Sequence, residues 1–342
     1  MITNGCNLKC RHCWPESLSH EAVLPVPVQP LKGLIMGFNR LGVEEICLTG
    51  GEPLTHPDWL EVFRFSCGQE GLRRVRLQTN GTLLTQKDVE HLAEIHKKEL
   101  IIQVSLEGAT PKTHDRLRGK GSFERAFRGL NRLAAAGMGG QTVVAFTETH
   151  YNFDDLPHLL KRLDGLGIGR LVSGTLVQAG RAARIHALEL PTPDQYRALL
   201  SLYHREEAFR KRYHKMANIA CLEWWFGKTN SASENCKCFE MPYVTTDGLL
   251  YPCIMIPADH LAVKNAHEQP LETLLKKAIP LWSGLPALNR RRTVELGLCQ
   301  TCSCKQHCAG GCMGRAYATT GDFMMVEDRC ALRKAVYGWD PI

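Results

Sequence analysis

The chain contains 342 residues, of which 44% are hydrophobic and 23% are charged, and its formal net charge is +7. No apolar run approaches the length of about 18 residues that a membrane span needs, and we find no cleavable signal. The positive charge is spread along the sequence without regularly interleaved aromatic residues. We therefore expect a cytoplasmic protein with neither a membrane nor a nucleic acid among its partners.

The 15 cysteines form two tight groups toward opposite ends of the chain. In a short secreted protein this number would indicate disulfides, but the chain is long and shows no signal for secretion. Metal ligation is therefore the better interpretation of both groups. Cys47 and Cys67 stand outside them in apolar strand and helix contexts, where we expect buried core residues.

Short apolar runs alternate with segments of helical period from residue 31 to about residue 177, which is typical of parallel strands joined by helices. Strands are predicted at 45–49, 75–79, 100–105, 141–147 and 170–177, with residues 1–3 as a stub of the first. Helices are predicted at 28–41, 58–69, 85–96, 122–136 and 154–166. These six units predict an α/β fold, a partial (β/α)6 TIM-like barrel followed by a small cysteine-rich domain.

The domain boundaries follow from a change of pattern after the barrel. The predicted barrel occupies residues 1–190, and Pro191 and Pro193 then precede a polar helix that reaches about Ala217. We interpret residues 191–235 as a helical linker. Residues 236–342 are loop-rich and hold most of the remaining cysteines, which predicts a second domain organised by metal.

Three cysteines, Cys6, Cys10 and Cys13, stand within eight residues as CxxxCxxC. A cubane iron-sulfur cluster usually takes four thiolates, so a local set of three leaves one iron open to an exogenous ligand. The alternative is a structural zinc knuckle. The cluster is favoured because the cysteines follow the strand stub, at the end of a sheet where α/β proteins place their sites.

Polar and glycine residues follow several of the predicted strands. Gly50 and Gly51 would let the backbone approach a ligand, and Glu52 could accept a hydrogen bond from an ammonium group. Asn80, Ser105 and Glu107 follow the next strands, where such side chains can bind ribose or carboxylate groups. Taken singly, each of these residues could instead cap a helix or form a turn.

The triad, the GGEP turn and the stretch from Ser105 to Gly119 together resemble the radical S-adenosylmethionine (SAM) superfamily. The resemblance implies that Cys6, Cys10 and Cys13 hold a [4Fe-4S] cluster whose fourth iron binds the amino and carboxylate groups of SAM. It further implies reductive cleavage of SAM to a 5'-deoxyadenosyl radical, which abstracts hydrogen from a substrate. An external electron donor such as flavodoxin or ferredoxin would then be needed.

The same resemblance suggests roles for residues around SAM. Glu52, with the backbone of Gly50 and Gly51, would receive the amino group, and Ser105 and Arg118 are candidates for the carboxylate. Asn80 and Glu107 would lie near the ribose. The backbone of His12 would meet the adenine.

The second cysteine group follows a spaced pattern that two zinc ribbons could also use. Its seven members are Cys238, Cys253, Cys299, Cys302, Cys308, Cys312 and Cys330. This spacing resembles the SPASM domain, which carries auxiliary iron-sulfur clusters in radical SAM enzymes.

By that resemblance, two auxiliary [4Fe-4S] clusters are implied. One would use Cys238, Cys253 and Cys312 with either Cys221 or Cys236, or would keep an open iron if neither binds. The other would use Cys299, Cys302, Cys308 and Cys330. Cys304 has no place in the pattern.

Enzymes with this pair of domains resemble maturases that modify a ribosomally made peptide or a protein side chain, with or without a separate peptide-recognition protein. A peptide or protein is thus the first expected substrate. A radical SAM enzyme that tailors a haem or tetrapyrrole precursor is the alternative, since a basic surface would suit propionates. A noncatalytic iron-sulfur scaffold is a third possibility, disfavoured because the triad and Glu52 occur together.

Overall fold

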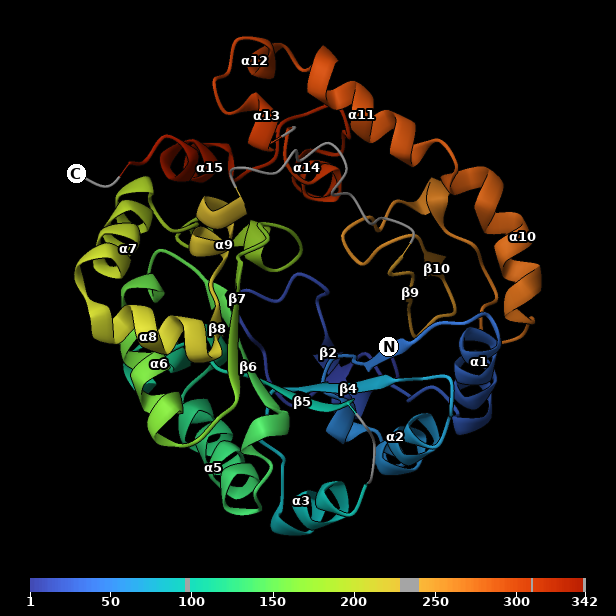
Figure 1. Ribbon diagram of the computed structural model, residues 1–342. Coiled ribbons are helices and arrows are strands. Elements are labelled where there is room, and N and C mark those ends of the chain that lie inside the picture. Colours follow the sequence, from blue (N-terminus) through green and yellow to red (C-terminus); the bar gives the residue numbers. More distant parts are fainter. Residues whose placement is uncertain (96–98, 228–239, 309, 341–342) are drawn as a thin grey trace.

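A six-stranded parallel sheet forms the centre of the protein, as the computed structural model shows for residues 1–95, 99–227, 240–308 and 310–340. The strands follow one another in the order of the sequence, so each crossover returns the chain to the next position (Figure 1). They are β3 (Glu45–Leu48), β4 (Arg74–Thr79), β5 (Glu99–Ser105), β6 (Thr142–Glu148), β7 (Arg170–Thr175) and β8 (Ala217–Asn218). The predicted α/β fold with a partial barrel is confirmed.

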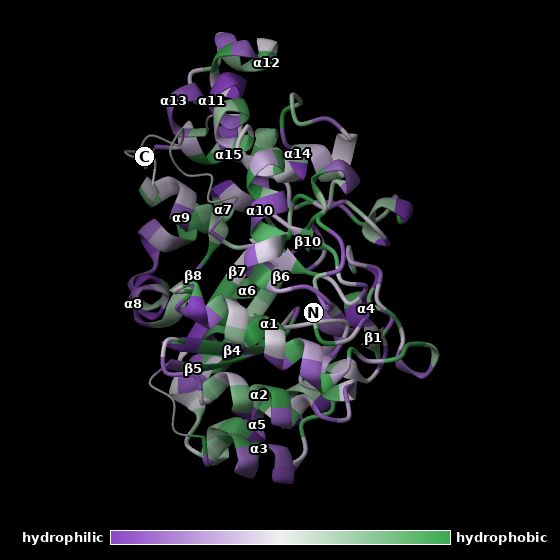
Figure 2. Cartoon of the chain, turned by 90° about the vertical axis from the view of Figure 1, so that its right-hand side faces the viewer, coloured by the Kyte–Doolittle hydropathy of each residue, from purple (hydrophilic) through white to green (hydrophobic). Residues whose placement is uncertain are grey.

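Helices surround this sheet on its outer side (Figure 1). They are α1 (Val28–Arg40), α2 (Trp59–Cys67), α3 (Gln86–Ala93), α5 (Ser122–Ala135) and α6 (Leu156–Gly165), while α4 (Pro111–Arg118) packs on α5. In α5 the buried residues Phe123, Ala126, Leu130 and Leu133 recur every three or four positions, which turns one stripe of the helix toward the strands. Figure 2 shows the corresponding contrast between hydrophobic strands and hydrophilic outer faces of the helices. Helix α4 is absent from the sequence prediction.

The segment expected as a linker packs on the barrel. It forms α7 (Pro193–Arg205), α8 (Glu207–Met216), strand β8 and α9 (Ala220–Phe226), and the single helix expected up to about Ala217 is interrupted at Glu206. Tyr196, Leu200 and Leu222 are fully buried in the same hydrophobic core as the strands. Strand β8 extends the sheet beside β7.

The first residues of the chain run beside the segment that directly follows β3. Thr3 forms a parallel bridge with Gly50, and the backbone N–H of Ile2 donates to the carbonyl of Thr49. The chain then forms β1 (Gly5–Cys6), which pairs in parallel with β2 (Leu18–Ser19). The predicted stub is therefore present as a short edge segment.

The remaining elements form the cysteine-rich region. They are β9 (Tyr243–Val244), β10 (Leu250–Tyr251), α10 (Leu271–Trp282), α11 (Leu285–Glu295), α12 (Gly297–Gln300), α13 (Lys305–Cys308), α14 (Met313–Thr320) and α15 (Cys330–Tyr337). A small core of its own includes Leu250, Trp282 and Met313, with Leu34 contributed by α1. Helix α10 contacts α1, while α15 contacts α7 and α9, so the region spans the arc between the first and last barrel helices (Figure 1).

The two cysteines expected in the barrel core differ in their surroundings. Cys67 is buried in α2, as predicted. Cys47 is exposed, so its predicted burial is wrong. It pairs in register with Arg76 of β4, on a strand face where Arg76 also bonds Glu45 and Gln103 and which is therefore polar. No helix in the described part of the chain is long and apolar enough to cross a membrane.

Candidate active site

The three N-terminal cysteines lie on one loop that is held at several points. Cys6 ends β1, and Cys10 and Cys13 follow before β2. The N–H of Arg11 donates to the carbonyl of Leu117 in α4 at 2.8 Å. Arg181, which follows β7, donates from its guanidinium to the carbonyls of Cys10 (2.8 Å) and Ser17 (2.9 Å). The loop is thereby held both by α4 and by the segment that follows β7.

The glycine pair after β3 allows this loop to approach the sheet. A Cβ at Gly50 would lie 2.2 Å from the carbonyl oxygen of Thr3, and one at Gly51 would lie 2.3 Å from that of Gly5. Instead, the N–H of Gly51 donates to Thr3 and that of Glu52 donates to Gly5, each at 2.8 Å. Only glycine permits so close a backbone contact at these two positions. The pair therefore positions the segment that leads into Cys6.

Glu52 is fully buried beneath the strand ends. Its carboxylate accepts hydrogen bonds from the Thr79 hydroxyl (2.6 Å), the Asn80 N–H (2.6 Å) and the Leu54 N–H (3.1 Å). Burial raises the pKa of Glu52, and these three donors oppose the rise. The side chain thus ties the end of β4 to the GGEP turn.

Glu107 and Arg118 form an ion pair inside the site. Two guanidinium nitrogens of Arg118 donate to Oε1 of Glu107 at 2.9 and 2.6 Å, and the N–H of Thr147 donates to Oε2 at 2.6 Å. His12 Nε2 lies 3.4 Å from the same carboxylate. Burial alone would raise the pKa of Glu107, but the charge of Arg118 and the hydrogen bonds outweigh it and lower the pKa to about 2. The carboxylate is therefore ionised at neutral pH.

One cavity joins the cysteine loop to the strand ends. Its lining includes Cys6, Cys10, Cys13, Gly50, Gly51, Asn80, Ser105 and Arg118. Glu52 and Glu107 lie behind this lining and act on it through Asn80, Thr79 and Arg118. The space amounts to about 1040 Å³, its open mouth included. Its polar and apolar lining and its open mouth are typical of a ligand-binding cleft.

The residues around this cavity suit an iron-sulfur cluster with three protein ligands. The three thiols share the cavity, and none of the thirteen described cysteines is in a disulfide. The Leu8 N–H donates to the Cys6 sulfur at 3.4 Å, and Arg118 approaches the Cys10 sulfur at 3.9 Å. Donors to sulfur are the groups that tune clusters of this kind. Burial raises the pKa of Cys6 to about 12, so the thiolate needs a positive partner such as iron.

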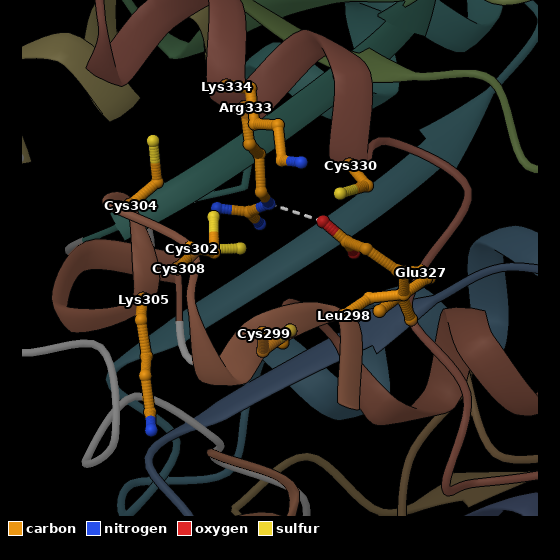
Figure 3. Close-up of a pocket in the computed structure, with 12 residues that line it drawn as sticks. Leu298, Cys299, Cys302, Cys304, Lys305, Cys308, Glu327, Cys330, Arg333 and Lys334 are labelled. Atoms are coloured by element: carbon orange, nitrogen blue, oxygen red, sulfur yellow. Dashed lines mark hydrogen bonds and ion pairs between the residues drawn. The ribbon is translucent and has the colours of Figure 1, made fainter. Parts of the chain in front are cut away.

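A second pocket gathers cysteines of the C-terminal group (Figure 3). Its lining includes Cys299, Cys302, Cys304, Cys308 and Cys330, with Arg333 and Lys334 beside them. No three Cys, His, Asp or Glu side chains of the described residues converge on a single metal ion. A zinc ion would need all its donors about 2.3 Å from one point, whereas a cubane takes one thiolate at each iron. Four of the lining cysteines, Cys299, Cys302, Cys308 and Cys330, are the set that the resemblance assigns to one auxiliary cluster.

The other C-terminal cysteines are only partly described. Cys253 and Cys312 are half-buried and are not in disulfides, and Cys236 and Cys238 lie outside the described residues. Cys221 is fully buried in the barrel core, where its thiol donates to the carbonyl of Tyr196 at 3.6 Å. It does not line the second pocket.

Glu327 organises the loop between these cysteines. Its buried carboxylate accepts from the N–H of Cys312 at 2.9 Å and pairs with Arg329 and Arg333, as Figure 3 shows for Arg333. Burial would raise the pKa of Glu327, but the charges of the two arginines lower it to about 2. The carboxylate thus connects the loop of Cys312 to the helix of Cys330.

Sequence reasoning missed several residues that build the site. Arg181, Thr79, Thr147 and Glu327 all hold a site loop or a site carboxylate in place. Their partners are backbone groups or residues far away in the sequence, so no local motif marks them. Thr79 alone carried a signal, because it stands at a strand end directly before Asn80.

Comparisons with known proteins agree with this geometry. Residues 1–163 match the model of the Radical SAM superfamily. An AdoMet-dependent heme synthase from Methanosarcina barkeri is 29% identical, over 97% of this chain and 95% of the relative. The mycofactocin maturase MftC from Mycobacterium tuberculosis is 28% identical, over 93% of this chain and 78% of the relative.

Solved structures share the whole architecture. The structure of native anSMEcpe with bound AdoMet and the Cp18Cys peptide has a TM-score of 0.72 at 16% identity, over 98% of this chain and 94% of that one. This likeness extends through both the barrel and the cysteine-rich region. The solved structure shows that the fold is shared, while the match of residues 1–163 and the three cysteines at the cavity lead to one conclusion: the chain belongs to the radical SAM superfamily and is a radical SAM enzyme.

Proposed function

We propose that this radical SAM enzyme modifies a side chain of a tetrapyrrole by hydrogen abstraction. The observation that carries the proposal is the similarity to an AdoMet-dependent heme synthase over 97% of the chain. The order of the two substrate classes is thus the reverse of that expected from the sequence, where a peptide came first.

In the proposed site, Cys6, Cys10 and Cys13 hold a [4Fe-4S] cluster and SAM binds its open iron. Bound there, the two cofactors supply a 5'-deoxyadenosyl radical that abstracts a hydrogen atom. Gly50, Gly51, Asn80, Ser105 and Arg118 would face SAM, since all of them line the cavity.

Glu52 and Glu107 would support this binding from behind. Glu52 holds the N–H of Asn80, and Glu107 holds the guanidinium of Arg118, so both orient groups that line the cavity. The open mouth of the cavity, which Tyr243 and Ile254 of the cysteine-rich region line, supports the entry of a substrate beside SAM.

Two auxiliary [4Fe-4S] clusters complete the proposal. Cys299, Cys302, Cys308 and Cys330 would hold one, supported by their common pocket. Cys238, Cys253 and Cys312 would hold the other. The burial of Cys221 in the barrel core supports Cys236 as its fourth ligand. The electron for SAM cleavage would come from an external carrier such as a flavodoxin or a ferredoxin.

A peptide or protein substrate is the second candidate function. It is favoured by the similarity to MftC over 93% of the chain and by the fold shared with anSMEcpe, whose solved structure holds the Cp18Cys peptide. Such an enzyme would carry the same cofactors and would differ in what enters the cavity mouth.

The test is anaerobic reconstitution followed by incubation with SAM, a reductant and iron coproporphyrin III. We expect the tetrapyrrole to stimulate 5'-deoxyadenosine formation and to change in mass. If it neither stimulates cleavage nor changes, the tetrapyrrole proposal fails and the peptide class takes its place. Three cubanes should give about 12 irons per chain, and about 4 would exclude the auxiliary clusters.

A further inference from the structure

Tyr243 brings the cysteine-rich region into the catalytic cavity. The residue lies on β9 and lines the cavity together with the three cysteines of the N-terminal loop. Ile254 is the other lining residue from this region, and it directly follows Cys253. The cavity is therefore closed on one side by residues from outside the barrel.

The hairpin that carries Tyr243 is firmly anchored. Tyr243 pairs across the strands with Tyr251 of β10, and the neighbouring Leu250 exchanges backbone hydrogen bonds of 2.8 and 2.9 Å with Val263. Leu250 is fully buried in the small core that Leu34 of α1 joins. Figure 1 shows this hairpin beside the N-terminal segment and α1. The phenol is thus held in a defined position relative to the barrel.

The Tyr243 hydroxyl has no hydrogen-bond partner among the described residues, although the ring is largely covered. Two other covered tyrosine hydroxyls are engaged: that of Tyr196 donates to Glu148 and that of Tyr213 donates to Glu223. Burial raises the pKa of Tyr243, so the phenol stays protonated and is a neutral donor at physiological pH.

The cavity offers an anionic substrate one guanidinium group and otherwise side-chain donors such as hydroxyl and amide groups, among which Tyr243 is the one donor side chain that the cysteine-rich region adds to the described lining. Arg118 is the one Lys or Arg side chain among its described lining residues, and Glu107 already pairs with it. A carboxylate that enters this space must therefore rely on neutral donors such as hydroxyl groups. A phenol–carboxylate hydrogen bond is charge-assisted and directional, and so it fixes the position of a bound side chain.

We propose that Tyr243 donates a hydrogen bond to a carboxylate of the tetrapyrrole substrate and so positions the reacting side chain in the cavity. This inference rests on the proposed function, because it takes its ligand from it. In this proposal Tyr243 contacts the substrate and not SAM. Its substitution should therefore weaken substrate binding, whereas substitution of the barrel residues should weaken SAM binding.

The test compares Tyr243→Phe with the matched variant Tyr251→Phe. Both changes remove one hydroxyl from the same hairpin, but Tyr251 does not line the cavity. Iron coproporphyrin III is titrated into the reconstituted enzyme with SAM, and its absorbance gives the Kd. We expect about tenfold weaker binding for Y243F, as the loss of one charge-assisted hydrogen bond predicts, and a change below about twofold for Y251F.

A second measurement is the ratio of 5'-deoxyadenosine formed to tetrapyrrole converted. It should rise in Y243F, because a loosely held side chain lets the radical be quenched without product. The electron paramagnetic resonance spectrum of the cluster with SAM should be the same in all three proteins. A purely structural role for Tyr243 would leave the ratio and the Kd unchanged.

Two results would overturn the inference alone. Y243F could match the wild type in Kd and in ratio, or it could change the SAM-bound spectrum, which would make Tyr243 a cofactor ligand. In both cases the wild type still converts the tetrapyrrole, so the proposed function survives. If the wild type itself neither binds nor converts iron coproporphyrin III, the proposed function fails and the inference fails with it.

Discussion

Glu107 in the barrel and Glu327 in the cysteine-rich region are both buried carboxylates paired with arginine, but their surroundings differ. Glu107 receives an N–H from β6 and its partner Arg118 ends α4, so regular elements already fix both groups. Glu327 lies between short helices and itself holds the loop of Cys312. In the barrel, strands and helices fix the positions of the site residues and the ion pair only orients the Arg118 side chain. In the cysteine-rich region, the ion pairs themselves hold the loops in position.

Other buried charges of the cysteine-rich region follow the same rule. Arg315 pairs with Asp328 and donates to the carbonyls of Thr175 and Leu176 at the end of β7. Arg292 is fully buried and donates to the carbonyls of Gly310, Gly311 and Met325. We therefore expect the barrel to tolerate loss of its cluster better than the cysteine-rich region tolerates loss of its own.

The largest expected effect is a difference in SAM cleavage between variants of the N-terminal and the C-terminal cysteine group. Cys10→Ala should lower 5'-deoxyadenosine formation by roughly ten-thousandfold, since the cluster that binds SAM is lost. Cys330→Ala should leave SAM cleavage within about tenfold and should lower the iron content by about four per chain. Product chromatography and iron analysis measure both. Equal losses of cleavage would contradict the assignment of separate roles.

The next effect concerns the barrel carboxylate. Glu107→Gln leaves Arg118 buried without its counter-charge, which should cost about 3–5 kcal/mol of unfolding free energy. The KM for SAM should also rise, because Arg118 lines the cavity. Urea unfolding and initial rates test this. If Glu107→Gln is as stable as the wild type and its KM for SAM is unchanged, the ion pair does not orient Arg118 for SAM binding.

Glu327→Gln should cost a similar amount, but in a different place. The loss should appear as faster hydrogen exchange between residues 296 and 337, with the strands of the barrel unchanged, because Glu327 holds only the loop of Cys312 and α15. Hydrogen exchange read by mass spectrometry locates the change. Exchange that rises equally in β4 and β5 would show that the two regions unfold together.

Acid should reduce the contribution of Glu107 and of Glu327 to the free energy of unfolding in the same pH range. Their folded pKa values of about 2 lie below the usual 4.5, so each contributes stability above about pH 4.5 and loses it as the pH falls toward 2. The contribution is about 3 kcal/mol for each group. The difference in unfolding free energy between the wild type and Glu107→Gln should therefore shrink below pH 4.5. A difference that stays constant down to pH 3 would contradict the lowered pKa.

The smallest effect tests the glycine pair. Gly51→Ala places a Cβ against the carbonyl of Gly5 and should cost about 1–3 kcal/mol, with reduced SAM cleavage as the segment before Cys6 is displaced. Gly33→Ala in α1 is the matched control, since a Cβ there meets nothing within 4 Å. It should stabilise the protein by about 0.5–1 kcal/mol. Urea unfolding and 5'-deoxyadenosine assays distinguish the two.

Much of the barrel was predictable because hydrophobic period reflects local geometry. The helices at 28–40 and 122–135 begin and end within one residue of their predicted bounds. The cysteines that line the two pockets were also predictable from their spacing, except for Cys304, which lines the second pocket although it has no place in the pattern. The packing of residues 193–226 on the barrel was not predictable, because the sequence of a polar helix does not indicate which part of the protein its apolar side contacts.

The remaining site residues depend on distant contacts. Arg181 reaches a loop more than 160 residues earlier in the chain, and its hydrogen bonds go to carbonyls that any residue would supply. Glu327 resembles an ordinary surface glutamate until Arg329, Arg333 and Cys312 fold around it. Such residues belong to no motif of fixed spacing, so the sequence alone does not identify them as site residues.

The short segment at the start of the chain also bears on aggregation. An open sheet has two edges, and unpaired edge strands can recruit a neighbouring molecule and begin aggregation. Here residues 2–5 bond to residues 49–52 directly after β3, which itself has only four residues, and at the far edge β8 offers only Ala217 and Asn218. Neither edge presents a long strand, so the incomplete barrel is protected from intermolecular strand pairing without closing into a ring.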